Sequence, residues 1–175
     1  LWTDRDARRY AYWAVFAGAF GHTYGNSAVM QMLKASHKNP SYGTKRYWDE
    51  AIHDPGSAQM RHLKNLILSR PFFERVPASE VVVDQRERYD RVLATRGRNY
   101  LFAYTYTGRP FELRLGVIEG ERVKAWWYNP RIGLAEEFGL FENSGSRTFT
   151  PPGGRAEGND WVLVLDDEAA GFPPP

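Results

Sequence analysis

The spacing of hydrophobic positions divides the chain into two parts. In the first part, apolar residues recur at the three- and four-residue spacing of an amphipathic helix. After Pro77 they alternate with polar residues, which is the period of a β-strand with one buried face. The pattern therefore predicts a helical part over residues 1–78 and a β-rich part over residues 79–175.

The first predicted helix starts close to the beginning of the chain. Thr3 is its expected N-cap, and Asp6 lies where an acidic side chain completes a capping box. Tyr10 and Trp13 follow at helical spacing, so we expect them, with neighbouring alanines, to form the buried face. The helix should end near Gly18.

The segment Gly18–Gly25 is predicted to be a buried strand, because it is too short and too rich in glycine for a helix. Its His22 and Tyr24 lie two positions apart, so a strand places both side chains on one face. A long polar stretch with one short helical turn follows. A second helix is then expected to begin at Asp54 and to end at Arg70, which precedes a proline.

The second part predicts short strands separated by turns. We expect strands over residues 100–106, 111–117, 123–127 and 161–165. The first of these is aromatic at its even-numbered positions, and the last is apolar on both faces, which is typical of a central strand. Short strands at this spacing predict an antiparallel β-sandwich.

The elements predicted for the helical part are too few to form a complete hydrophobic layer. A helix, one strand and a second helix cannot enclose a hydrophobic core by themselves, whereas this order is typical of the end of a (β/α)8 TIM barrel. We therefore expect a mixed fold: the C-terminal end of such a barrel, followed by the β-sandwich. The chain opens on Leu1 rather than Met, so we expect the remainder of the barrel to lie upstream.

Composition narrows the possible partners. With 23 basic and 21 acidic residues the net charge is only +2, so a nucleic-acid partner is not expected. Cysteine is absent, which excludes disulfides and thiol chemistry within the chain. No apolar run has the length of a membrane span. No metal site or other cofactor is expected, because none of the histidines pairs at ligand spacing; they are His22, His37, His53 and His62.

Two sets of side chains are candidates for sugar contact. His22 and Tyr24 lie at the end of the predicted strand, where barrel enzymes place reacting groups, and both can hydrogen-bond a sugar hydroxyl. The alternative for them is a buried pair held by the backbone. Trp126 and Trp127 point to opposite faces of a strand. One is expected in the core, and the other either packs inside as well or forms an exposed platform for a sugar ring.

Several segments, in this order, resemble one family. They include Gly21-His22-Thr23-Tyr24-Gly25, Pro55-Gly56-x-x-Gln59-Met60, Ala125-Trp126-Trp127-Tyr128-Asn129-Pro130-Arg131 and Asp160-Trp161-Val162-Leu163-Val164-Leu165. Together they resemble the apiosidase-like glycoside hydrolases (family 140). In that family a catalytic barrel is followed by a small β domain named for collagen binding.

The resemblance implies a bacterial hydrolase, secreted or periplasmic, that cleaves glycosidic bonds in polysaccharides. It implies two catalytic carboxylates that both lie upstream of Leu1, so no catalytic residue is expected in this chain. By the family's motif, His22 and Tyr24 would bind the sugar substrate, with Asn26 and Gln31 in the following loop as further substrate-binding candidates.

Two other hypotheses stay open at this stage. The β-sandwich could be a module that binds glycan or collagen without catalysis. The chain could also be a self-contained binding protein with mixed helices and strands.

Overall fold

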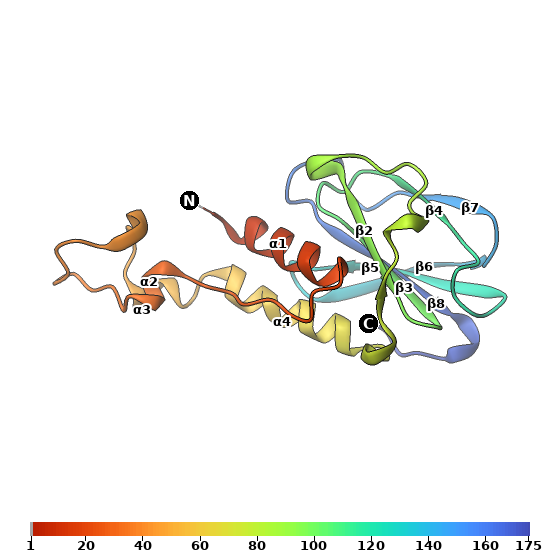
Figure 1. Ribbon diagram of the computed structural model, residues 1–175, viewed down its shortest axis with the longest axis horizontal. Coiled ribbons are helices and arrows are strands. Elements are labelled where there is room, and N and C mark those ends of the chain that lie inside the picture. Colours follow the sequence, from red (N-terminus) through yellow and green to blue (C-terminus); the bar gives the residue numbers. More distant parts are fainter. Residues whose placement is uncertain (1) are drawn as a thin grey trace.

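The computed structural model describes residues 2–175 and places helices first and strands afterwards, as the hydropathy pattern predicts (Figure 1). The helices are α1 (Asp4–Phe16), α2 (Ser27–Met30), α3 (Trp48–Ala51) and α4 (Pro55–Leu68). The strands are β1 (Val76–Pro77), β2 (Val92–Arg96), β3 (Tyr100–Thr105), β4 (Phe111–Arg114), β5 (Arg122–Asn129), β6 (Leu134–Glu142), β7 (Ser146–Phe149) and β8 (Trp161–Asp167). Short 3₁₀ turns include η1 (Ser41–Gly43), η3 (Ser79–Val81) and η4 (Arg88–Asp90).

All strand pairs are antiparallel. Six strands form one sheet in the order β1-β2-β3-β8-β5-β6, and β4 pairs with β7 in a separate two-stranded ribbon. The strand that is apolar on both faces, β8, lies between β3 and β5, so its predicted central position is confirmed. The fold is therefore a mixture of helices and antiparallel sheet.

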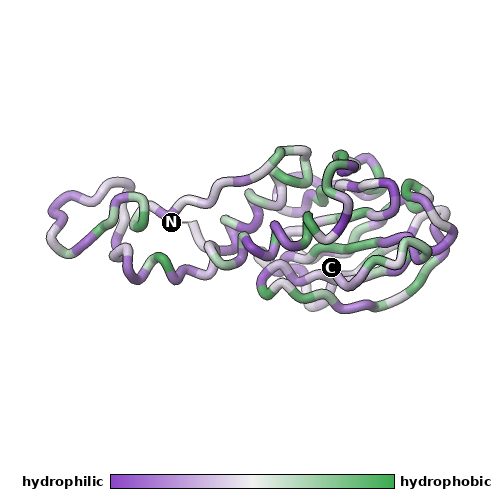
Figure 2. The backbone as a smooth tube through the Cα atoms, turned by 90° about the horizontal axis from the view of Figure 1, so that it is seen from below, coloured by the Kyte–Doolittle hydropathy of each residue, from purple (hydrophilic) through white to green (hydrophobic). Residues whose placement is uncertain are grey.

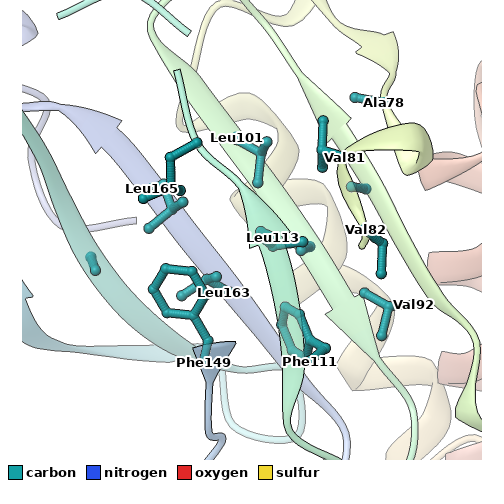
Figure 3. Close-up of a cluster of buried hydrophobic side chains, with 14 of the residues drawn as sticks. Ala78, Val81, Val82, Val92, Leu101, Phe111, Leu113, Phe149, Leu163 and Leu165 are labelled. Atoms are coloured by element: carbon teal, nitrogen blue, oxygen red, sulfur yellow. The ribbon is translucent and has the colours of Figure 1, made fainter. Parts of the chain in front are cut away.

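Each face of the six-stranded sheet covers its own hydrophobic cluster. Leu101, Leu163 and Leu165 face the ribbon, where they meet Phe111 and Phe149 (Figure 3). The alternate positions of the same strands face α1 and α4, and they include the even-numbered aromatic residues of β3. Figure 2 shows the runs of apolar residues along these strands.

Helix α1 begins as predicted but buries a different face. The capping box between Thr3 and Asp6 is present. The residues that pack on the sheet are Tyr12 and Phe16, whereas Tyr10 is exposed and was wrongly predicted to be buried. The helix turns this side inward because Tyr12 stacks on Tyr104 of β3, with ring centroids 4.7 Å apart.

The segment Gly18–Gly25 is not a strand in the structure. It is coil, and no strand within residues 2–175 pairs with it, although Gly18 lies against Pro77 of β1. A strand requires a partner for its backbone hydrogen bonds, whereas here the backbone N–H groups of Gly18 and Ala19 donate to carbonyls of α1. The alternation of side chains predicted for His22 and Tyr24 therefore has no sheet to define it.

The alternative that Trp126 or Trp127 forms an exposed platform for a sugar ring is also wrong. Trp126 and Trp127 do point to opposite faces, but they are only 7% and 6% exposed. Trp126 packs with the helices, and Trp127 packs with the ribbon. Both faces of β5 are covered, so neither ring is available to a sugar.

Two buried arginine–aspartate pairs join the helices to the central strand. Arg8 of α1 binds Asp160, with Nε–Oδ2 at 2.9 Å and Nη2–Oδ1 at 3.1 Å. Arg70, just after α4, binds Asp166 in the same bidentate way, at 2.8 and 2.7 Å. Asp160 immediately precedes β8, and Asp166 lies near the other end of that strand. The helical part and the sheet therefore share both a hydrophobic core and two ionic links.

The contacts of Asp90 are expected to make the stability of the fold slightly dependent on pH. A hydrogen bond from Arg155 lowers the pKa of Asp90, and one from Thr107 lowers it further, against the raising effect of burial. A lowered folded pKa gives stability that is present above the ordinary aspartate pKa, near 4, and is lost as the pH falls through the folded pKa. We expect Asp90→Asn to reduce the melting temperature more at pH 7 than at pH 3. The reduction should be slight, because Arg155 is exposed and water weakens its pairing. An equal loss at both pH values, in melting curves, would contradict this.

Candidate functional site

A hollow of about 780 Å³ lies between the start of α1, the extended segment after it, and the starts of α2 and α4. His22, Tyr24 and Asn26 line it, and Gln31 does not. Trp2 and Tyr10 lie on the same hollow, and their rings stack at a centroid distance of 4.7 Å. Three of the predicted sugar-binding residues are therefore brought together with two further aromatic rings.

His22 and Tyr24 are among the polar side chains of this hollow that make no hydrogen bond within residues 2–175, as are Thr23 and Lys45. His22 is exposed and Tyr24 is half-buried. Neither side chain has a hydrogen-bond partner within residues 2–175, so the alternative of a buried pair held by the backbone is wrong. An imidazole and a phenol in this condition can both donate to and accept from the hydroxyl groups of a ligand.

Gly56 sets the position of Tyr24. A Cβ on this glycine would lie 3.3 Å from the Tyr24 ring and 3.4 Å from the Cα of Asp4. The absence of a side chain lets the starts of α1 and α4 approach each other closely. The Tyr24 ring then rests on the first turn of α4.

The base of the loop after the extended segment is closed by polar contacts. Asn26 donates from Nδ2 to Oδ2 of Asp54 at 2.9 Å, and its Oδ1 accepts from the backbone N–H of Ala28 at 3.0 Å. Arg46 pairs with Asp54, and also with Glu50 at 3.7 Å. Asp54, the residue before Pro55, therefore links Asn26 at one end of the loop to Arg46 at the other. Both ends of the Asn26 side chain are already engaged.

Gln31 fastens the outer part of the same loop. Its Nε2 donates to the carbonyl of Ser27 at 2.9 Å and to that of Ser41 at 3.2 Å, and it lies 3.3 Å from Oγ1 of Thr44. Its Oε1 accepts from the backbone N–H of Ser41 at 2.7 Å. The structure thus places this amide in contact with the loop itself.

The acidic groups of the hollow are both paired. Asp4 accepts hydrogen bonds from Arg8 at 2.6 Å and Gln59 at 3.4 Å. Burial would raise the pKa of Asp4, but these bonds lower it overall. Burial would likewise lower the pKa of Arg8, and the carboxylates of Asp160 and Asp4 raise it instead. In residues 2–175 no three histidine, aspartate or glutamate side chains gather so as to hold a metal ion.

The connection between this hollow and the sheet was not predicted from the sequence. Asp4 lines the hollow, and Arg8 joins it to Asp160, which also accepts a hydrogen bond from Tyr104 at 3.1 Å. The available signal was an aspartate at each end of the apolar strand, together with arginines among the apolar residues of α1 and after α4.

Comparison with known proteins connects both parts to carbohydrate-active enzymes. Residues 1–74 match the family described as "Apiosidase-like, catalytic domain", and residues 76–166 match the one described as "Putative collagen-binding domain of a collagenase". One solved structure, titled glycoside hydrolase, is 49% identical with a TM-score of 0.92; the match covers 97% of this chain and 38% of that one. Another, a glycoside hydrolase family 5 from Bacteroides vulgatus, is 44% identical with a TM-score of 0.94, and the match covers 98% and 38%. No curated protein matches the chain.

These similarities, rather than the fold, relate the chain to glycoside hydrolases. More specifically, the chain belongs to the apiosidase-like glycoside hydrolases, and it combines sequence of their catalytic domain with the β domain that follows. It spans 38% of the length of the two solved structures. Within residues 2–175, no helix has the length and apolar character needed to cross a membrane.

Proposed function

We propose that the chain works as part of a longer glycoside hydrolase that cleaves glycosidic bonds in polysaccharides outside the cytoplasm, secreted or periplasmic. In this proposal residues 1–78 end a catalytic TIM barrel, and residues 79–175 form an accessory β-sandwich that braces it. The observation that carries the proposal is the hollow lined by the unpaired side chains of His22 and Tyr24, in a chain that is 49% identical to a glycoside hydrolase.

The exposed apolar side chains near the extended segment support the proposal that further barrel strands pack against this part of the chain. Phe20 is 88% exposed and Phe73 is 95% exposed, and Leu68 of α4 is exposed as well. Large apolar groups gathered on a surface mark an interface. Further barrel strands beside Gly18–Gly25 would cover these side chains and supply the backbone partners that the segment lacks.

Within this hydrolase, His22 and Tyr24 hydrogen-bond the sugar and the chain supplies no catalytic carboxylate. Two carboxylates facing one another across a substrate are required for the usual mechanism, whereas Asp4 and Asp54 are both held by arginines. The two acids are contributed by the upstream part of the barrel. Asn26 lies beside His22 and Tyr24 on the hollow and supports the loop that bounds the sugar site.

The activity of the complete protein tests this function. We expect it to release reducing sugars from plant cell-wall polysaccharides, and we expect residues 1–175 alone to show no turnover. Hydrolysis by the pure 175-residue chain would contradict the upstream position of the carboxylates. Failure of the complete protein on every glycan in a broad panel would contradict the proposed function itself.

A glycan- or collagen-binding β domain without catalysis is the other candidate, and the description of the family matched by residues 76–166 favours it. The burial of Trp126 and Trp127 removes the platform that a sugar would have used. Retention of residues 1–175 on collagen or polysaccharide affinity gels would support this second function.

A further inference from the structure

An exposed tyrosine stands at the tip of the loop that bounds the hollow. Tyr42 lies in η1, two residues before Thr44, which lines the hollow, and its side chain is 84% exposed. Figure 1 shows the loop projecting away from the sheet, beyond α2 and α3. A large aromatic ring in this position has no hydrophobic core to join.

The backbone holds Tyr42 in an unusual conformation. Its φ of 59° and ψ of 24° lie in the left-handed region, which residues other than glycine, asparagine and aspartate seldom adopt. Gly43 follows with a φ of 64°. Such a conformation persists only where the surroundings enforce it.

The surroundings that enforce it are hydrogen bonds to Ser41 and Thr44. Gln31 both donates to and accepts from the backbone of Ser41, and the Thr44 hydroxyl donates to the Ser41 carbonyl at 2.9 Å. At the far end of the loop, Trp48 donates from its backbone to the carbonyl of Leu33 at 3.0 Å. The loop is therefore braced on both sides of Tyr42, so the ring is presented from a fixed backbone.

We propose that Tyr42 contacts the carbohydrate chain beyond the unit held in the hollow, and that Gln31 is its positioning residue. A sugar whose first unit hydrogen-bonds His22 and Tyr24 continues past the rim formed by Thr44 to Arg46. The flat ring of Tyr42 suits the C–H face of a sugar, and its hydroxyl suits the ring's polar edge. This inference rests on the proposed function and adds a preference for longer substrates.

The test compares substrate lengths in the complete hydrolase. For Tyr42→Ala, KM for the longer members of a cello-, xylo- or galacturono-oligosaccharide series should rise about five-fold, with kcat and the shortest cleaved substrate unchanged. Tyr42→Phe keeps the ring and loses only the hydroxyl, so its KM for the longer substrates should rise by less than that of Tyr42→Ala. Gln31→Ala should shift KM in the same direction as Tyr42→Ala, and Lys38→Ala, an exposed change in the same loop, should have no effect.

Two outcomes would overturn the role of Tyr42. One is an unchanged KM for every length in Tyr42→Ala. The other is an equal loss on all lengths, which would mean that the ring packs against protein. If the unaltered enzyme hydrolyses no member of the series, that result bears on the proposed function and not on Tyr42. Fluorescence titration with the same oligosaccharides then tests the role of Tyr42. Tyr42→Ala should bind the longer ones about five-fold more weakly than the unaltered enzyme does.

Discussion

Replacing Asp160 by alanine is expected to lower the free energy of unfolding of the complete protein by about 3–5 kcal/mol, the usual cost of breaking a buried ion pair. Asp160 is fully buried, and it accepts two hydrogen bonds from Arg8 and one from Tyr104. Without it, the charge of Arg8 stays buried with only Asp4 and Gln59 as partners. Urea unfolding measures this loss.

The appropriate control lies three residues earlier. Glu157→Ala removes an exposed carboxylate from the same turn and should change stability by about 0.5 kcal/mol or less. A double variant with Arg8→Met and Asp160→Leu should recover part of the loss, because it removes both members of the buried pair. A loss below about 1 kcal/mol in Asp160→Ala, the size typical of a surface pair, would contradict the ionic link between α1 and β8.

The elements that were predicted correctly are those specified by local chemistry. Thr3 and Asp6 identify the start of α1 within a single turn, and Pro55 does the same for α4. The strand β8 is apolar on both faces, and only a central position buries both. These features depend on residues close together in the chain.

The features that were missed depend on distant partners. The segment Gly18–Gly25 has the residues of a strand, but the described chain holds no strand to pair with it. The edge strand β6 escaped prediction because its exposed, charged positions hide the alternation. Arg8 and Asp160 are separated by 152 positions, so nothing local indicates that they meet.

The candidate site also combines features that depend on nearby residues with features that depend on distant ones. His22 and Tyr24 both line the hollow, whereas their role in binding sugar stays a prediction. The bracing role of Gln31 could not be predicted, since it depends on where a loop ten residues later folds back. Its amide alone is compatible with binding either a sugar or a backbone.

The largest expected effect on activity is at His22 and Tyr24. In the complete hydrolase, His22→Ala is expected to lower kcat/KM by about 10- to 100-fold, because loss of a hydrogen bond leaves a buried sugar hydroxyl unsatisfied at a cost of about 1–3 kcal/mol. Tyr24→Phe should lower it by about 10-fold for the same reason, while the ring continues to pack against Gly56. The folded structure should be unaffected, since neither side chain makes a hydrogen bond within the described residues.

Matched substitutions outside the hollow separate this effect from general damage. His53 and Tyr47 are exposed and do not line the hollow. His53→Ala and Tyr47→Phe should therefore keep the activity and the melting temperature of the unaltered enzyme.

The central claim is that this chain forms one wall of a glycosidase's sugar site. The most direct measurement is kcat/KM of the complete hydrolase carrying His22→Ala, beside His53→Ala, on a polysaccharide that the unaltered enzyme cleaves. We expect a fall of about ten-fold or more for His22→Ala alone, with an unchanged melting temperature. Equal activity in the two variants would contradict it.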